Sequence, residues 1–151
     1  MRREAGFSYV IVMFLVAVLS LLAARAMENT LTAERRQKED ELLRVGQAYR
    51  DAIRSYYEQS PGTAKVYPPT LEALLLDGRG TRLRRPLRKL FRDPMNSDAK
   101  WGVLEAEGGG VMGVYSLSTL KPIKTDGFPA ELAGFTNAKH YSEWQFTYQP
   151  Q

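Results

Sequence analysis

An uncharged apolar segment near the N-terminus limits what this chain can fold into. The segment from Phe7 to Ala24 has eighteen residues and reads FSYVIVMFLVAVLSLLAA, with charged residues at positions 2–4 before it and Arg25 after it. As a helix it would extend about 27 Å, which nearly matches the hydrocarbon core of a membrane, about 30 Å thick. We therefore predict a transmembrane helix over residues 7–27.

A cleavable secretory signal peptide is the alternative interpretation of this segment. The apolar run is longer than the central region of such peptides, which usually has about 7 to 15 residues. Ala23, Ala24 and Ala26 nevertheless supply small residues of the kind found at a cleavage site. Counting basic residues on the two sides does not settle the orientation of the helix, because both sides carry several.

The remainder of the chain is large enough for one modest domain. The protein has 151 residues, so a single core is expected once the apolar segment is set aside. The formal net charge of +4 is basic, but it is far from that of a nucleic-acid packaging protein. The absence of cysteine excludes disulfides and thiolate metal sites.

The residues that precede the apolar segment form a specific pattern. Residues 2–9 read RREAGFSY, a short basic leader that ends in glycine and is followed by the phenylalanine that opens the apolar helix. This pattern resembles the class III signal of type IV pilins and type II secretion pseudopilins. The resemblance implies that residues 1–6 are a leader peptide, that a prepilin peptidase cleaves between Gly6 and Phe7, and that the new N-terminus of Phe7 is methylated.

Position 11 departs from the family pattern. Most members have a glutamate at the fifth mature position, where this chain has Ile11. In the family, that carboxylate pairs with the N-terminal amine of a neighbouring subunit during assembly, and a carboxylate inside a membrane is costly without such a role. Ile11 therefore favours a minor or atypical subunit over a major filament subunit.

A second helical pattern follows the apolar segment and contains no proline up to Gln59. Charged pairs four residues apart, such as Glu34 with Lys38, support a solvated helix, and Gly46 is expected to be tolerated at a small cost. A coiled coil is the alternative, but residues 28–41 are too polar for a continuous heptad seam. We predict that residues 28–59 continue the membrane helix. The apolar residues of its later half fall three or four positions apart on one face: Leu42, Val45, Tyr49, Ala52, Ile53 and Tyr56.

Residues 60–151 are predicted to form a periplasmic α+β head domain. Residues 70–78 read as a short helix capped by Thr70, and residues 83–94 as an extended or turn-rich connector. Strands are expected over residues 101–104, 111–117 and 142–148, with the glycines at 108–110 in a hairpin turn. The predicted fold class is α+β, with a long N-terminal helix, transmembrane in its first half, packed on a small antiparallel sheet.

The head sequence also resembles that of the major pseudopilins. The resemblance rests on Tyr67-Pro68 followed by Leu71 and Leu74, and on Asp93-Pro94 followed by Trp101. It covers residues 1 to about 117 and implies a pilin-like fold, whereas the last thirty or so residues match no pattern.

No catalytic, nucleotide or metal site is predicted. His140 is the only histidine, and glycines 108–110 lack the Lys-Ser/Thr that follows in phosphate-binding loops. Calcium-binding pseudopilins have an aspartate- and glycine-rich loop where residues 118–124 read STLKPIK, and Asp126 alone is a poor source of the six to eight or so oxygens that calcium needs. We expect no enzyme activity, cofactor, metal or small-molecule substrate.

The feature best suited to binding lies within residues 79–92, where seven of fourteen residues are basic and none is acidic. Such a cluster could bind phosphate. Its apolar residues are mostly leucines rather than stacking aromatics, so three interpretations stay open: contact with a neighbouring subunit or plain solvation, binding of anionic lipid, and binding of DNA. We call it the arginine cluster: Arg79, Arg82, Arg84, Arg85, Arg88, Lys89 and Arg92.

The resemblance implies a non-catalytic subunit that crosses the bacterial inner membrane once, with its N-terminus cytoplasmic and its head periplasmic. It would assemble through its N-terminal helix into a type II secretion pseudopilus or a type IV pilus-like fibre. The expected partners are other pilin or pseudopilin subunits, prepilin peptidase, the assembly platform and inner-membrane lipid. The alternatives are a minor pilin that binds DNA through the arginine cluster, and a signal-anchored periplasmic scaffold that does not polymerise.

Overall fold

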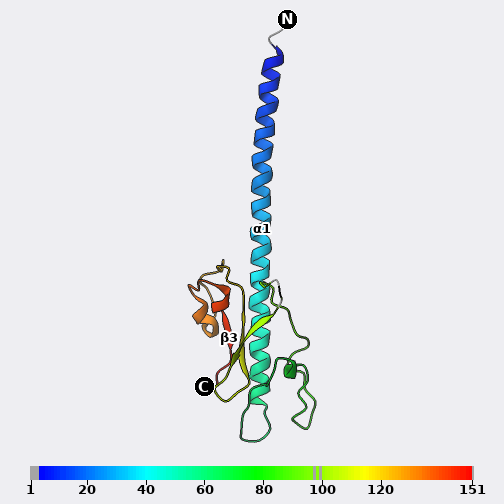
Figure 1. Ribbon diagram of the computed structural model, residues 1–151, viewed down its shortest axis with the longest axis vertical. Coiled ribbons are helices and arrows are strands. Elements are labelled where there is room, and N and C mark those ends of the chain that lie inside the picture. The colour runs from blue at the N-terminus through cyan, green and yellow to red at the C-terminus, as the bar shows by residue number, and fades with distance from the viewer. Residues whose placement is uncertain (1–3, 97, 99, 151) are drawn as a thin grey trace. The chain divides into compact units, whose positions relative to one another are not determined.

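The computed structural model describes residues 4–96, 98 and 100–150, and the side chains of all of these except residues 4–7, 28 and 29. They form a long helix α1 (Glu4–Glu58), an antiparallel sheet and three short 3-10 helices (Figure 1). The strands are β1 (Trp101–Glu105), β2 (Val111–Ser116) and β3 (Gln145–Thr147), and the 3-10 helices are η1 (Glu72–Leu74), η2 (Ala130–Phe135) and η3 (Tyr141–Glu143). The chain divides into two compact units, Met1–Gln37 and Lys38–Gln151.

The described part of the first unit is the N-terminal stretch of α1. This stretch contains a segment that is long and apolar enough to cross a membrane, a property that a signal sequence near an N-terminus shares. The predicted leader lies partly outside the described residues, because positions 1–3 are not among them. Gly6 and Phe7 belong to α1, but the side chain of Phe7 is not among the described ones.

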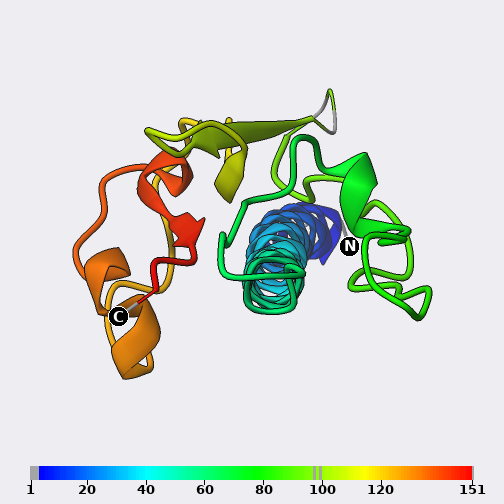
Figure 2. The same ribbon diagram turned by 90° about the horizontal axis from the view of Figure 1, so that it is seen from below.

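The second unit is built around the part of α1 that follows Lys38. The predicted apolar face is its centre, since all six residues of that face are at most 6% exposed. Figure 2 shows residues 72–92, in green, on one side of this part of α1 and the C-terminal segment, in orange and red, on the other. The helix therefore supplies the core on which both segments pack, as the prediction of an α+β head packed on a helix requires.

The sheet has the strand order β1-β2-β3, and both pairs are antiparallel. Val114, at the centre of β2, lies opposite Val103 of β1 and Phe146 of β3. The predicted hairpin turn is confirmed, since Ala106 N–H donates to the Gly110 carbonyl at 2.9 Å and Gly109 N–H donates to the Ala106 carbonyl at 2.9 Å. Gly110 has a φ of 87°, which favours glycine.

Two predicted elements are shorter than expected. The helix predicted over residues 70–78 is only the turn η1, and Leu71, not Thr70, stands at its N-cap without a side-chain capping bond. The chain leaves helical geometry after Leu75 because Leu74 accepts a hydrogen bond from Leu87 N–H and Asp77 pairs with Arg84. The last strand begins at Gln145 rather than at residue 142, because residues 141–143 form η3.

The C-terminal segment, to which the family resemblance does not extend, contains a buried aromatic group. Trp144 is fully buried, and its ring stacks on Phe135 with centroids 5.4 Å apart and an interplanar angle of 5°. Phe128 and Tyr141 meet the Trp144 ring edge-on at 5.4 and 5.2 Å. These contacts extend the core beyond the sheet and add stability beyond that of area burial alone.

A buried carboxylate on α1 fixes this segment to the helix. Glu39 is 4% exposed, and its oxygens accept hydrogen bonds from Ile123 N–H at 2.7 Å, Lys124 N–H at 3.0 Å and the Tyr141 hydroxyl at 2.7 Å. A buried carboxylate is stable only when its lone pairs are satisfied in this way.

Candidate functional site

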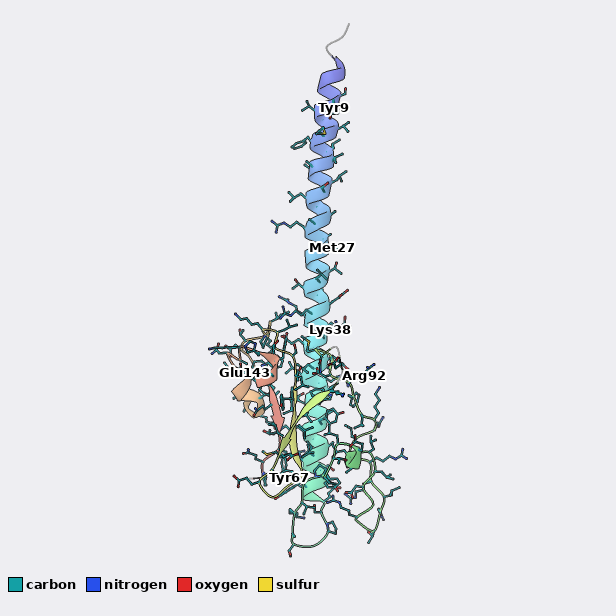
Figure 3. The ribbon with its side chains drawn as sticks, in the orientation of Figure 1. Tyr9, Met27, Lys38, Tyr67, Arg92 and Glu143 are labelled. Carbon is teal, nitrogen blue, oxygen red and sulfur yellow. The ribbon has the colours of Figure 1, made fainter. Side chains whose placement is uncertain are left out.

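The first candidate interaction surface is the apolar stretch of α1. Every described side chain from Ser8 to Met27 is exposed, including large apolar ones such as Phe14 at 68% and Leu19 at 63%. Side chains between Tyr9 and Met27 project from the helix in several directions (Figure 3). An apolar surface of this extent needs to be covered by lipid or by other apolar helices.

The polar groups within this stretch are compatible with such a covering. The Ser20 hydroxyl donates to the carbonyl of Val16 at 2.8 Å, so the helix itself satisfies this hydroxyl. Ile11, which stands where pilins usually have glutamate, is 43% exposed. The apolar character of the segment is therefore uninterrupted at this position.

The second candidate surface is the arginine cluster, and within it Arg79 differs from the other members. Arg79 donates from Nε to Asp77 Oδ1 at 2.8 Å, from Nη1 to Ser60 Oγ at 3.1 Å and from Nη2 to the Tyr56 carbonyl at 2.7 Å. Its guanidinium also lies 3.4 Å from the centroid of the Tyr56 ring. Arg79 therefore connects its own loop to the C-terminal end of α1, and its donors are already engaged inside the protein.

The pKa values of this ion pair follow from the same contacts. The hydrogen bond from Arg79 is the main cause that lowers the pKa of the Asp77 carboxyl, while burial acts in the opposite direction. The hydrogen bond to Asp77 raises the pKa of Arg79. Both groups are consequently charged at neutral pH, and their charges compensate each other.

The six other members of the cluster are exposed. The Arg84 guanidinium contacts the side-chain oxygen of Gln59, and the Lys89 ammonium lies 5.2 Å from the centroid of the Phe91 ring. Asp93, the acid that follows the cluster, is buried and accepts a hydrogen bond from Ser116 Oγ at 2.7 Å. Asp93 is thus engaged in the core, and the cluster presents a basic surface to solvent.

The remaining residue considered in the sequence is His140. His140 is exposed, and its Nδ1 lies 2.5 Å from the carbonyl oxygen of Thr119. Within residues 4–96, 98 and 100–150, no group of three or more histidine, aspartate or glutamate side chains is placed to hold a metal ion.

Sequence reasoning missed three buried carboxylates, Glu39, Asp77 and Asp93. Glu39 lies three residues before Leu42 and thus on the apolar face that the spacing had identified. An acidic residue in that register was a signal for a buried acceptor. Asp93 had no comparable signal, because its partner Ser116 is twenty-three residues away along the chain.

The described fold is a long helix joined to a small three-stranded antiparallel α+β unit, with an apolar exposed stretch at one end of the chain. The predicted processing site, Gly6 and Phe7, stays a prediction, because backbone structure does not report peptide cleavage or methylation. In comparisons with known proteins, no family model, curated protein or solved structure matches this chain.

Proposed function

We propose that this chain is a non-catalytic pilin-like or pseudopilin subunit of the bacterial inner membrane. Residues 7–27 anchor it in a single pass, with the N-terminus in the cytoplasm and the head in the periplasm. The subunit later assembles through this helix into a type II secretion pseudopilus or a type IV pilus-like fibre. The observation that carries the proposal is the exposed apolar stretch of α1, which the leader-like residues RREAG precede.

The physical basis of assembly is that one surface serves in two environments. Lipid tails and the side chains of a sister helix are about equally apolar, so exchanging one for the other requires little free energy. The satisfied hydroxyl of Ser20 leaves no polar group that would oppose the exchange at that position. The subunit can thus be stored in the membrane and moved into a fibre.

Ile11 places the proposed subunit among the minor or atypical members. Because no carboxylate stands at the fifth mature position, the subunit cannot offer this charge to the N-terminal amine of a neighbour. Its recruitment then depends on apolar helix contacts and on the head. Other pilin subunits, the assembly platform and prepilin peptidase are its proposed partners.

Mass spectrometry of the mature N-terminus tests this proposal. In cells with an active prepilin peptidase, we expect a protein that begins at Phe7 and carries one added methyl group. Replacing Gly6→Val should leave the leader attached, whereas the control Ala5→Val, one residue further from the bond, should still be processed. An intact Met1 in cells with the active peptidase would support a signal-anchored scaffold, and a mature start beyond Ala26 would indicate an ordinary secreted protein.

DNA binding by a minor pilin is the second candidate function, and the exposure of six members of the arginine cluster favours it. A gel-shift experiment with the full chain in detergent distinguishes this function from subunit contact. If DNA binds here, changing Arg84, Arg85 and Arg88 to glutamate should abolish the shift, because the variant reverses three phosphate-binding charges. A shift that survives these changes would exclude the arginine cluster as the DNA site.

A further inference from the structure

A cavity of about 420 Å³ lies where the loop 78–84 meets the residues that follow α1. Gln59 and Pro61 line one part of it. The loop itself contributes Gly80, Thr81, Arg82 and Arg84. A water molecule occupies roughly 30 Å³ in the liquid, so the cavity has room for a hydrated ligand of several heavy atoms.

The loop that forms this cavity is fixed at its base. Asp77 and Arg84 exchange two backbone hydrogen bonds, with N–O distances of 2.8 and 2.9 Å, and enclose the six residues GRGTRL. Arg79 fastens the loop to Asp77 and to the ring of Tyr56. The loop backbone is therefore held in place before any ligand arrives, which reduces the entropy lost on binding.

The net charge of the cavity is positive. Asp77 also lines it, but both oxygens of this carboxylate accept hydrogen bonds from Arg79, at 2.8 and 2.9 Å. With this pair compensated, the guanidinium groups of Arg82 and Arg84 supply two further positive charges. Both side chains are exposed, so an incoming anion reaches them without opening the core.

Backbone donors add to this charge. Within the described residues, the N–H groups of Gly80, Thr81 and Arg82 donate no hydrogen bond to another backbone group. The space beside Gly80 is open, because an added Cβ would find its nearest neighbour, the carbonyl oxygen of Arg82, at 3.9 Å. Successive backbone N–H groups in a turn can form an anion-binding concavity.

We propose that the loop 78–84 binds a small oxyanion of the phosphate class through the guanidinium groups of Arg82 and Arg84, with support from the Thr81 hydroxyl and the loop N–H groups. Planar guanidinium groups match the spacing of phosphate oxygens and bind them bidentately. The phosphate group belongs either to a free ion or to the headgroup of an anionic lipid. The site is separate from the helix proposed to mediate assembly.

Binding measurements on the full chain in detergent test the site. In one arm, inorganic pyrophosphate is titrated by calorimetry. In the other, the micelles contain a short-chain phosphatidic acid or, as the uncharged comparison, a phosphatidylcholine of the same chain length. We expect saturable binding in at least one arm, and the arm in which it occurs identifies the source of the phosphate.

Two pairs of arginine variants test whether the anion binds in this cavity. The double variant Arg82→Gln/Arg84→Gln should weaken binding about tenfold or more, because two charge-assisted contacts are lost. The matched pair Arg88→Gln/Arg92→Gln removes the same charge from exposed positions that do not line the cavity, and it should change the affinity no more than about twofold. Equal losses in the two pairs, or an absence of saturable binding in both arms, would overturn the proposal. N-terminal processing and fibre assembly do not affect this readout, so it can fail while the proposed function stands.

Discussion

Asp77 illustrates how single side chains stabilise the head. It is 5% exposed, and its oxygens accept from the N–H and the guanidinium of Arg79. The hydrogen bond from Arg79 lowers the pKa of Asp77 in the folded state. A group whose pKa is lowered by folding contributes stability above its unfolded-state pKa, and this contribution is lost as the pH falls through the folded-state value.

We therefore predict that the free energy of unfolding falls as the pH is lowered from about 5 to below 3, and that Asp77 contributes to this slope. Asp77→Asn should be less stable than the wild type at pH 7, and the difference should shrink in acid, where Asp77 of the wild type becomes protonated. Urea unfolding followed by tryptophan fluorescence at several pH values measures this. Asp51→Asn, at an exposed carboxylate of the same unit, is the control. Equal acid dependence of the wild type and Asp77→Asn would contradict the prediction.

The sequence predicts which residues of α1 are buried, but not the partners of the buried polar groups. The buried positions of Leu42, Tyr49 and Tyr56 could be predicted because helical spacing alone identifies the face. The partners of Glu39 and Asp77 could not, because they depend on which loops return to the helix. The sequence likewise does not show that one member of the arginine cluster, Arg79, is bound inside the head while the others are exposed.

At the scale of elements, Gly46 determines how closely α1 approaches the sheet. The sequence indicated only a helix position of low propensity, whereas the structure places the ring of Phe146 against it. A Cβ at position 46 would overlap this ring, which is fully buried and cannot move aside freely. The glycine is thus a packing requirement between α1 and β3.

We predict that Gly46→Ala destabilises the head by about 1–2 kcal/mol, because overpacking outweighs the better helix propensity of alanine, which is worth about 1 kcal/mol. Urea unfolding of the full chain in detergent measures the change. Gly108→Ala, where an added Cβ meets no atom within 4 Å, is the matched control and should show a smaller loss. Combining Gly46→Ala with Phe146→Leu should give less destabilisation than the sum of the two single changes, and strict additivity would argue against the contact.

Elements were predictable where a local pattern is strong enough to act alone. The single helix through Glu58, the hairpin glycines and the strands beginning at residues 101 and 111 fall in this class. The segment 70–78 is different, since hydrogen bonds from Leu87 and Arg84 override its helical signals. Residues 118–143 fold through ring contacts with Trp144 and through hydrogen bonds to Glu39, which is 84 to 102 positions away. No local periodicity predicts such a structure.

At the scale of the whole molecule, α1 belongs to both units, and the surroundings of its apolar side chains differ between them. Its apolar residues are exposed up to Met27, whereas from Leu42 onward those of one face are buried in the head core. The sequence shows this change, because a continuous apolar run gives way to a one-sided apolar face. The arginine cluster was also visible in sequence, but the cavity at loop 78–84 depends on the Asp77–Arg84 pairing and was not.

The proposed membrane anchor leads to a prediction for the whole chain. Val16→Arg places a charge near the middle of the apolar segment, where insertion becomes less favourable by about 2.5–3.5 kcal/mol. The fraction of the protein that resists alkaline carbonate extraction of membranes should therefore fall markedly. Leu120→Arg, at an exposed apolar position of the head, should leave this fraction unchanged. Identical extraction of the two variants would show that residues 7–27 do not anchor the protein.

The bonds that Glu39 accepts have a consequence for the order of events during synthesis. Its donors follow it by 84 to 102 positions, so this carboxylate leaves the ribosome long before Ile123 and Tyr141 exist. Until then it must stay hydrated, because a lone charge cannot be buried. The head therefore closes only after Tyr141 has been synthesised, by which time the proposed membrane helix has long been free to insert.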